Sequence, residues 1–160
     1  MIAAQKLRLD GARNIGVLDL DRHIGNGTDD IIWQLSLDYI THYTFGGERI
    51  DKGNAEEWLK DLPDILARFA DCDIVLYQAG ADPHVDDPLG GVLTTEQLYE
   101  RDFLVFHGLK SLNISVSGVA TKTASRYSYP DSKKKGHTVW KMLFETLCRR
   151  RSILVRSFYS

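Results

Sequence analysis

The stretch NIGVLDLDRHIGNGT, residues 14 to 28, carries the strongest structural signal in the chain. Its first half is almost continuously apolar, which is typical of a parallel β-strand covered on both faces. We therefore expect a strand from Asn14 to Asp21. A turn at Gly25-Asn26-Gly27 follows it. Thr28-Asp29-Asp30 then predicts a helix through Leu37, because cap and acidic residues favour helix N-termini.

Extended and helical patterns alternate along the rest of the chain. Apolar runs predict three further strands, over Tyr39 to Phe45, Asp73 to Tyr77 and Ile114 to Ala120. Helices are expected over Ala3 to Leu9, after Asn54, from Thr94 with Gln97 as its cap to about Leu112, and from about Lys133 to Arg149. This alternation predicts a single domain over residues 1–160, a three-layer α/β/α fold with a mainly parallel sheet. Ligand sites in such folds lie at the carboxyl ends of the strands.

Two further patterns predict details of the helices. Asn54-Ala55-Glu56-Glu57 resembles a capping box, and Pro63 is expected to kink the helix that follows or to divide it into two. Trp33, Trp58 and Trp140 all fall within helical patterns, so we expect them to be core or half-buried packing residues.

Composition excludes several classes of function. The chain has 160 residues, a net charge of -2 and 26% charged residues, without the basic excess that nucleic-acid or anionic-membrane binding needs. No apolar stretch approaches the roughly 20 residues of a membrane-spanning helix. Cys72 and Cys148 lack the spacing of a metal site and are expected to be reduced thiols. We therefore expect a cytoplasmic protein with no nucleic-acid or membrane partner.

The end of the first strand carries the residues with the clearest chemistry. Alternate residues of a strand point to one side, so Asp19, Asp21 and His23 share a side if the strand geometry persists that far. Two neighbouring carboxylates repel each other, and each is costly to bury. A cation relieves both effects, and Asp oxygen with His nitrogen is a ligand set that suits Zn²⁺.

A third ligand is expected from the end of another strand. Asp82 lies just past the strand that contains Tyr77, and Gly80 permits a tight exit from it. His84, Asp86 and Asp87 are alternatives in the same loop. We expect a structural role for His84, and we expect Asp87 to hold the turn formed by residues 88–91.

These residues carry a family resemblance. VLDLDRHIGNGT, residues 17 to 28, resembles the Asp-x-Asp-x-His-(His)-Gly-Asn-Gly-Thr signature of the histone deacetylase and acetylpolyamine amidohydrolase family. QAGADPHVDDPLGG, residues 78 to 91, resembles its second signature, a Gly-x-Asp followed by Asp-Pro-Leu-Gly. VATKTASRYSYPD, residues 119 to 131, is similar to the VAWNLAGGY segment of bacterial members. The motifs occur in family order, and the match runs from Ala3 to about Leu147.

The resemblance implies an arginase/deacetylase-like fold, incomplete at its N-terminal side, and zinc-dependent deacetylase chemistry. Asp21, His23 and Asp82 would hold the zinc. Asp19 would lie behind them and, with Asp21 and the backbone near His23, would contribute to a structural potassium site. The substrate would be acetyl-lysine, an acetylpolyamine or another small amide.

Two further residues take roles from the same resemblance. Tyr127 matches the catalytic tyrosine, which donates a hydrogen bond to the polarised acetyl oxygen, and Leu89 matches a residue that lines the acyl tunnel. Ser125-Arg126 stands where the family has Gly-Gly, so larger side chains would crowd the tunnel beside Tyr127.

Other departures leave a second function open. Family members are usually more than twice this length, and their paired histidines, the general base and acid, would precede Met1. The five histidines here include no such pair. General acid–base catalysis contributes roughly 10²–10⁴-fold, so the alternative is a noncatalytic, degenerate deacetylase-like domain that acts in association. An exposed sheet edge would also favour a homo-oligomer.

A phosphatase of the haloacid-dehalogenase type is a further alternative. Such enzymes also begin with a hydrophobic strand and Asp-x-Asp, in which Asp19 would be the nucleophile and Asp21 the acid, with Mg²⁺ bound. That family has Thr or Val where His23 stands, and it does not account for the second signature. The deacetylase-like interpretation explains both.

Overall fold

The computed structural model describes residues 1–88 and 91–120 of the chain. The elements in this part are α1 (Ile2–Leu9), β1 (Ile15–Asp19), α2 (Asn26–Gln34), β2 (Ile40–Thr44), the 3₁₀ turn η1 (Phe45–Gly47), α3 (Ala55–Ala67), β3 (Ile74–Ala79), α4 (Thr95–Ser111) and β4 (Ser115–Ala120). The helix expected from Lys133 to Arg149 lies outside the described residues.

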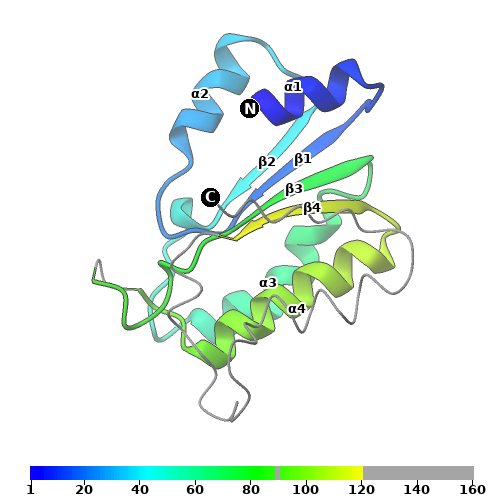
Figure 1. Cartoon of the computed structure of the whole chain (residues 1–160). Coiled ribbons are helices and arrows are strands. Elements are labelled where there is room, and N and C mark those ends of the chain that lie inside the picture. The colour runs from blue at the N-terminus through cyan, green and yellow to red at the C-terminus, as the bar shows by residue number, and fades with distance from the viewer. Residues whose placement is uncertain (89–90, 121–160) are drawn as a thin grey trace, which may run out of the picture.

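The four strands form one parallel sheet in the order β2-β1-β3-β4. Figure 1 shows α1 and α2 on one face of this sheet and α3 and α4 on the other. The expected α/β fold with a parallel sheet is therefore confirmed for the described residues. No helix among them is both long and apolar enough to cross a membrane.

The core lies around the two central strands, β1 and β3. Leu18 on β1 pairs in register with Tyr43 on β2 and with Tyr77 on β3, and all three side chains are buried. Since a parallel sheet is covered on both faces, such strands are rich in apolar residues. Gly16 on β1 also leaves room for a ring, because a Cβ there would lie 2.6 Å from Cδ1 of Phe69.

Helix α3 continues through Pro63, so of the two expected effects, a kink or a division, the division does not occur. A proline inside a helix costs about 3 kcal/mol. The neighbouring Leu62 and Leu66 are 0% and 1% exposed, and burial stabilises such a side chain by about 1.5–3 kcal/mol. Gly108 of α4 lets the two helices approach closely, because a Cβ there would lie 2.6 Å from Cδ1 of Leu66. Packing thus outweighs the local preference.

The two expected caps differ in outcome. At α4, the Thr94 backbone N donates to Gln97 Oε1 (2.9 Å) and the Gln97 N donates to Thr94 Oγ1 (3.2 Å), so this cap is confirmed. At α3, Asn54 makes no side-chain cap bond, and the capping box was wrong there. Its side chain accepts from the Asp51 N (2.7 Å) and donates to the Arg49 O (2.9 Å). Asn54 therefore closes the preceding loop.

The tryptophans also differ. Trp58 is buried, and its Nε1 donates to Tyr43 Oη (2.9 Å), as expected for a core residue. Trp33 is 81% exposed, so its assignment to the core was wrong. Helix α2 has no buried residue, and it packs on β2, which is one of the two outer strands of the described sheet. Trp140 lies outside the described residues.

Candidate metal centre

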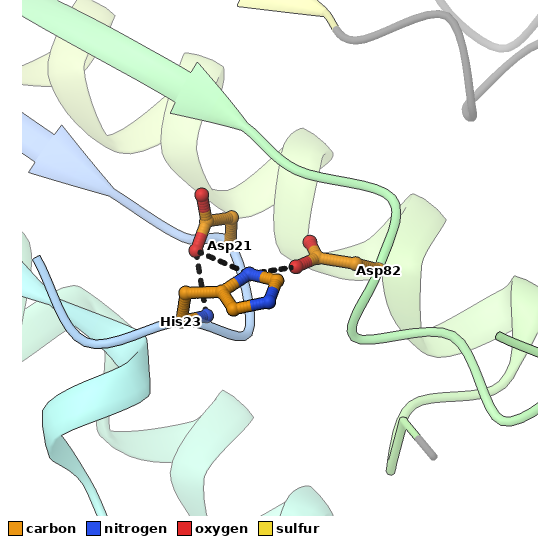
Figure 2. A group of neighbouring side chains, drawn as sticks. All are labelled: Asp21, His23 and Asp82. Atoms are coloured by element: carbon orange, nitrogen blue, oxygen red, sulfur yellow. Dashed lines mark hydrogen bonds and ion pairs between the residues drawn. The ribbon is translucent and has the colours of Figure 1, made fainter. Parts of the chain in front are cut away.

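Asp21, His23 and Asp82 lie together at the carboxyl end of the sheet (Figure 2). Asp21 and His23 follow β1, and Asp82 follows β3. Because β1 and β3 are neighbouring parallel strands, their ends meet at the same edge. One possible ligand atom from each residue falls within 4.8 Å of the other two. The structure thus brings together the three residues that the sequence singled out as ligands.

The ring of His23 lies between the two carboxylates. Its Nδ1 is 2.8 Å from Asp82 Oδ2 and 3.7 Å from Asp21 Oδ1 (Figure 2). Ligand atoms at about 2.0–2.2 Å from a tetrahedral zinc are about 3.4 Å apart, and these two distances lie on either side of that value. The His23 side chain is 64% exposed, so the group is open to solvent on one side.

Backbone amides hold the two carboxylates in place. The His23 N donates to Asp21 Oδ1 (2.7 Å), and the Arg22 N donates to Asp82 Oδ2 (3.1 Å). The chain bends here, since β1 ends at Asp19. The strand geometry therefore does not persist to His23, and bends rather than strand alternation bring His23 beside Asp21.

The electrostatics favour a cation at this position. Burial raises the pKa of Asp82, with a further increase from Asp21, while the Arg22 amide and His23 act in the opposite direction. Asp82 Oδ1 is buried and has no hydrogen-bond partner among the described residues. An orphaned carboxylate oxygen beside a second carboxylate and an imidazole nitrogen is a donor set that fits Zn²⁺.

Asp19 lies behind this group and is not part of it. Its Oδ1 accepts from the Asp21 N (3.3 Å), and burial raises its pKa, with Asp21 adding to the increase. Thr44 Oγ1 lies nearby, accepting from the Gly25 N (3.1 Å) and donating to the His23 O (3.4 Å). These contacts fix the loop that carries His23.

Two glycines make the convergence possible. A Cβ on Gly80 would lie 2.2 Å from Asp21 Cβ and 2.6 Å from Asp82 Oδ1. A Cβ on Gly46 would lie 2.0 Å from the His23 O. The tight exit at Gly80 was expected. The need for Gly46 was missed, because it depends on a contact between loops that no local pattern indicates.

A buried arginine beneath the group was also missed. Arg101 on α4 is 2% exposed, and its Nη1 donates to the Leu20 O (3.0 Å) and the Gly80 O (2.7 Å). It also pairs with the buried Asp102. The sequence does indicate that Arg101 is buried, because Arg101 and Asp102 stand four residues before Val105 and Phe106 and so share the apolar face of the helix.

The remaining candidates lie elsewhere. His84 is buried at 3% exposure, its Nε2 is 2.9 Å from Thr95 Oγ1, and its Nδ1 accepts from the Asp86 N (3.1 Å). These contacts agree with the structural role expected for it. Leu89 and Tyr127 lie outside the described residues.

Comparisons with known proteins supply little beyond this geometry. No family model matches the chain. The chain is 32% identical over 123 residues to an uncharacterized protein of Picosynechococcus sp.. The match covers 65% of this chain, and the chain spans 41% of the length of that relative.

Proposed function

We propose that the chain is a zinc-dependent, deacetylase-like hydrolase domain of the arginase/deacetylase-like fold, which acts on an acetylated amine such as acetyl-lysine or an acetylpolyamine. The observation that carries the proposal is the convergence of Asp21, His23 and Asp82 within 4.8 Å. Two motifs about 60 residues apart contribute these side chains, and the two motifs are those that resemble the family signatures. The parallel sheet is compatible with the proposed fold.

In this proposal the three side chains hold the zinc. Bound zinc would polarise an amide carbonyl and lower the pKa of a water molecule. His23 would bind through Nδ1, the ring nitrogen that faces both carboxylates. The exposed side of His23 leaves room for the substrate amide to approach. Asp19 keeps Asp21 in position through the Asp21 amide and is proposed to contribute to a structural potassium site.

Other parts of the proposal rest on the resemblance alone. Tyr127 would donate a hydrogen bond to the acetyl oxygen as negative charge develops on it, and Leu89 would line the acyl tunnel. Both residues lie outside the described part of the chain.

A second candidate is a noncatalytic deacetylase-like domain that acts in association with another chain, including a second copy. The sequence contains no two adjacent histidines to serve as base and acid. His42 and His84 lie next to Asp29 (2.6 Å) and Thr95 (2.9 Å) instead. On α2, the Trp33 side chain is 81% exposed. Without a general base, hydrolysis would be about 10²–10⁴-fold slower.

Zinc content and hydrolysis together test the two candidates. The purified chain is compared with Asp82→Ala and with Asp86→Ala, whose carboxylate lies in the same loop with a side chain that is 79% exposed. About one zinc per chain, lost in Asp82→Ala and kept in Asp86→Ala, supports the metal site. Zinc-dependent release of acetate from an acetyl-lysine peptide or N-acetylputrescine then supports the hydrolase.

The other outcomes are equally decisive. Zinc binding without acetate release favours the noncatalytic domain, and light scattering then tests whether Trp33→Ser changes its oligomeric state. A chain that binds no zinc, or that binds it equally in Asp82→Ala, overturns the proposed function.

A further inference from the structure

We propose that Arg101 is the positioning residue of this metal site: it binds the carbonyl oxygens of Leu20 and Gly80, and so keeps Asp21 and Asp82 at ligand spacing. The inference rests on the proposed function where metal affinity is concerned. The geometry that it describes belongs to the protein without metal, and it can be tested there.

The position of Arg101 relative to the strand ends carries the inference. The β1–β3 register ends at Asp19 and Gln78, and the Leu20 N donates to the Gln78 O (3.0 Å) just beyond it. Among the described residues, no backbone–backbone hydrogen bond joins the two segments after that point. Arg101 Nη1 bridges them there, at 3.0 Å from the Leu20 O and 2.7 Å from the Gly80 O.

The two carbonyls stand next to the ligands in the chain. Leu20 directly precedes Asp21, and Gly80 is two residues before Asp82. Gly80 also lies against Asp21, where a Cβ would come within 2.2 Å of Asp21 Cβ. Moving either carbonyl therefore changes the distance between the two carboxylates. The guanidinium makes no hydrogen bond to either carboxylate and interacts with Asp82 only through its charge, so its hydrogen bonds act on the two ligands through the backbone.

Arginine suits this position because its planar guanidinium presents donors in a fixed fork. Nε and Nη2 each lie 2.8 Å from Asp102 Oδ1, which leaves Nη1 aimed at the two carbonyls. Tyr77 Oη donates to the same Asp102 oxygen (2.5 Å), and burial raises the pKa of Tyr77 well above its usual range, so the phenol keeps its proton. Asp102 thus orients the arginine and balances its buried charge.

A residue needed only for stability would have different effects from a positioning residue. Loss of a purely stabilising interaction lowers the melting temperature, but the protein that stays folded binds metal as before. Loss of a residue that orients metal ligands typically weakens metal affinity about 10–100-fold. Tyr77→Phe provides the matched control, because it removes a bond within the same buried network and leaves the bonds to both carbonyls in place.

Two variants remove the bridge in different ways. Arg101→Met combined with Asp102→Asn removes both buried charges, so that no unpaired charge remains. Arg101→Lys keeps the positive charge next to Asp102 but replaces the fork with a single ammonium group. If the double variant does not fold, Arg101→Lys still tests the inference.

The first readout is metal affinity, measured by titration with Co²⁺ in the full chain at a temperature well below each melting point. We expect binding about 10–100-fold weaker in the Arg101 variants, with an altered visible absorption spectrum of the cobalt complex. We expect unchanged affinity and spectrum in Tyr77→Phe. Unchanged affinity and spectrum in folded Arg101 variants would overturn the inference.

The second readout needs no metal. The Arg22 amide donates to Asp82 Oδ2 across the gap between the strand ends, so its hydrogen exchange reports whether the segments stay together. We expect exchange at least about tenfold faster in the Arg101 variants and unchanged in Tyr77→Phe. Faster exchange in a chain that binds no Co²⁺ would support the positioning role while the proposed function fails. Unchanged exchange in the folded Arg101 variants would refute the positioning role in either case.

Discussion

Replacing Gly80 with alanine should loosen the candidate metal centre and destabilise the fold together. The new Cβ would lie 2.2 Å from Asp21 Cβ and 2.6 Å from Asp82 Oδ1. Carbon atoms in contact are normally about 3.5–4.0 Å apart, so the two segments must separate by about 1.3–1.8 Å. Overpacking of this kind costs about 1–3 kcal/mol. A site that must be held within about 0.5 Å cannot absorb such a shift, so we expect metal affinity to fall at least about tenfold.

Urea unfolding and Co²⁺ titration of the same preparations measure the two effects. Gly27→Ala is the control, because a Cβ at Gly27 meets nothing within 4 Å and the residue lies in helix α2. That variant should change the free energy of unfolding by no more than about 1 kcal/mol, in the stabilising direction, and should leave affinity unchanged. A Gly80→Ala protein as stable as the parent, with the parent's affinity, would refute the reasoning from close approach.

Three further outcomes follow from the structure. Tyr43→Phe leaves the Trp58 Nε1–H without its 2.9 Å partner, so the free energy of unfolding should fall by about 1–3 kcal/mol. Urea unfolding measures this, and an unchanged midpoint would contradict it. The backbone amides of Asn14 and Arg13 lower the pKa of Asp73 below 3.8. This carboxylate therefore stabilises the fold above about pH 4. Its contribution is lost as pH falls, because the unfolded chain takes up the proton first. Asp73→Ala should therefore be less stable than the parent at neutral pH, and acid titrations of unfolding should bring the two together; a constant difference down to about pH 2.5 would contradict this. Zinc at 100 times its Kd should stabilise the parent by about 2.7 kcal/mol, and chelation should reverse the shift in melting temperature.

Much of the fold follows from local pattern. The runs at residues 14–21, 39–45, 73–77 and 114–120 predict the four strands to within about two residues, because a buried parallel strand must be apolar. The order of the strands could not be read in the same way. Their order depends on which faces the helices cover, and no single segment contains that information.

The errors have a common cause. Pro63 and Asn54 have strong local preferences, yet α3 runs through Pro63 and Asn54 bonds to the loop behind it. Trp33 lies within a helical pattern as Trp58 does, but only Trp58 belongs to the buried core cluster, where it contacts Tyr43 and Phe45. Tertiary packing decides each of these cases, and propensity is only a weak guide where packing competes with it.

The candidate site divides in the same way. Asp21, His23 and Asp82 could be named from the sequence because their chemistry is distinctive and strand ends in a parallel sheet meet at one edge. Gly46 could not, because its importance comes from the His23 carbonyl, which would lie 2.0 Å from a Cβ there. Arg101 is separated by 81 residues from one of the carbonyls it binds, and a buried arginine on an apolar helix face gives no indication of its acceptor.

Folding alone gives no reason for this arrangement of acids. Burial raises the pKa of Asp82, Asp21 raises it further, and Oδ1 of Asp82 has no hydrogen-bond partner in the described part of the chain. A carboxylate placed for stability would be paired, as Asp102 is by Arg101 and Tyr77 a short distance beneath. The same region therefore contains one acid that is fully compensated, Asp102, and another, Asp82, with one oxygen paired and the other without a partner. Locally unfavourable groups held by an otherwise well-bonded frame are characteristic of functional sites, and a cation is the ligand that would supply the missing compensation.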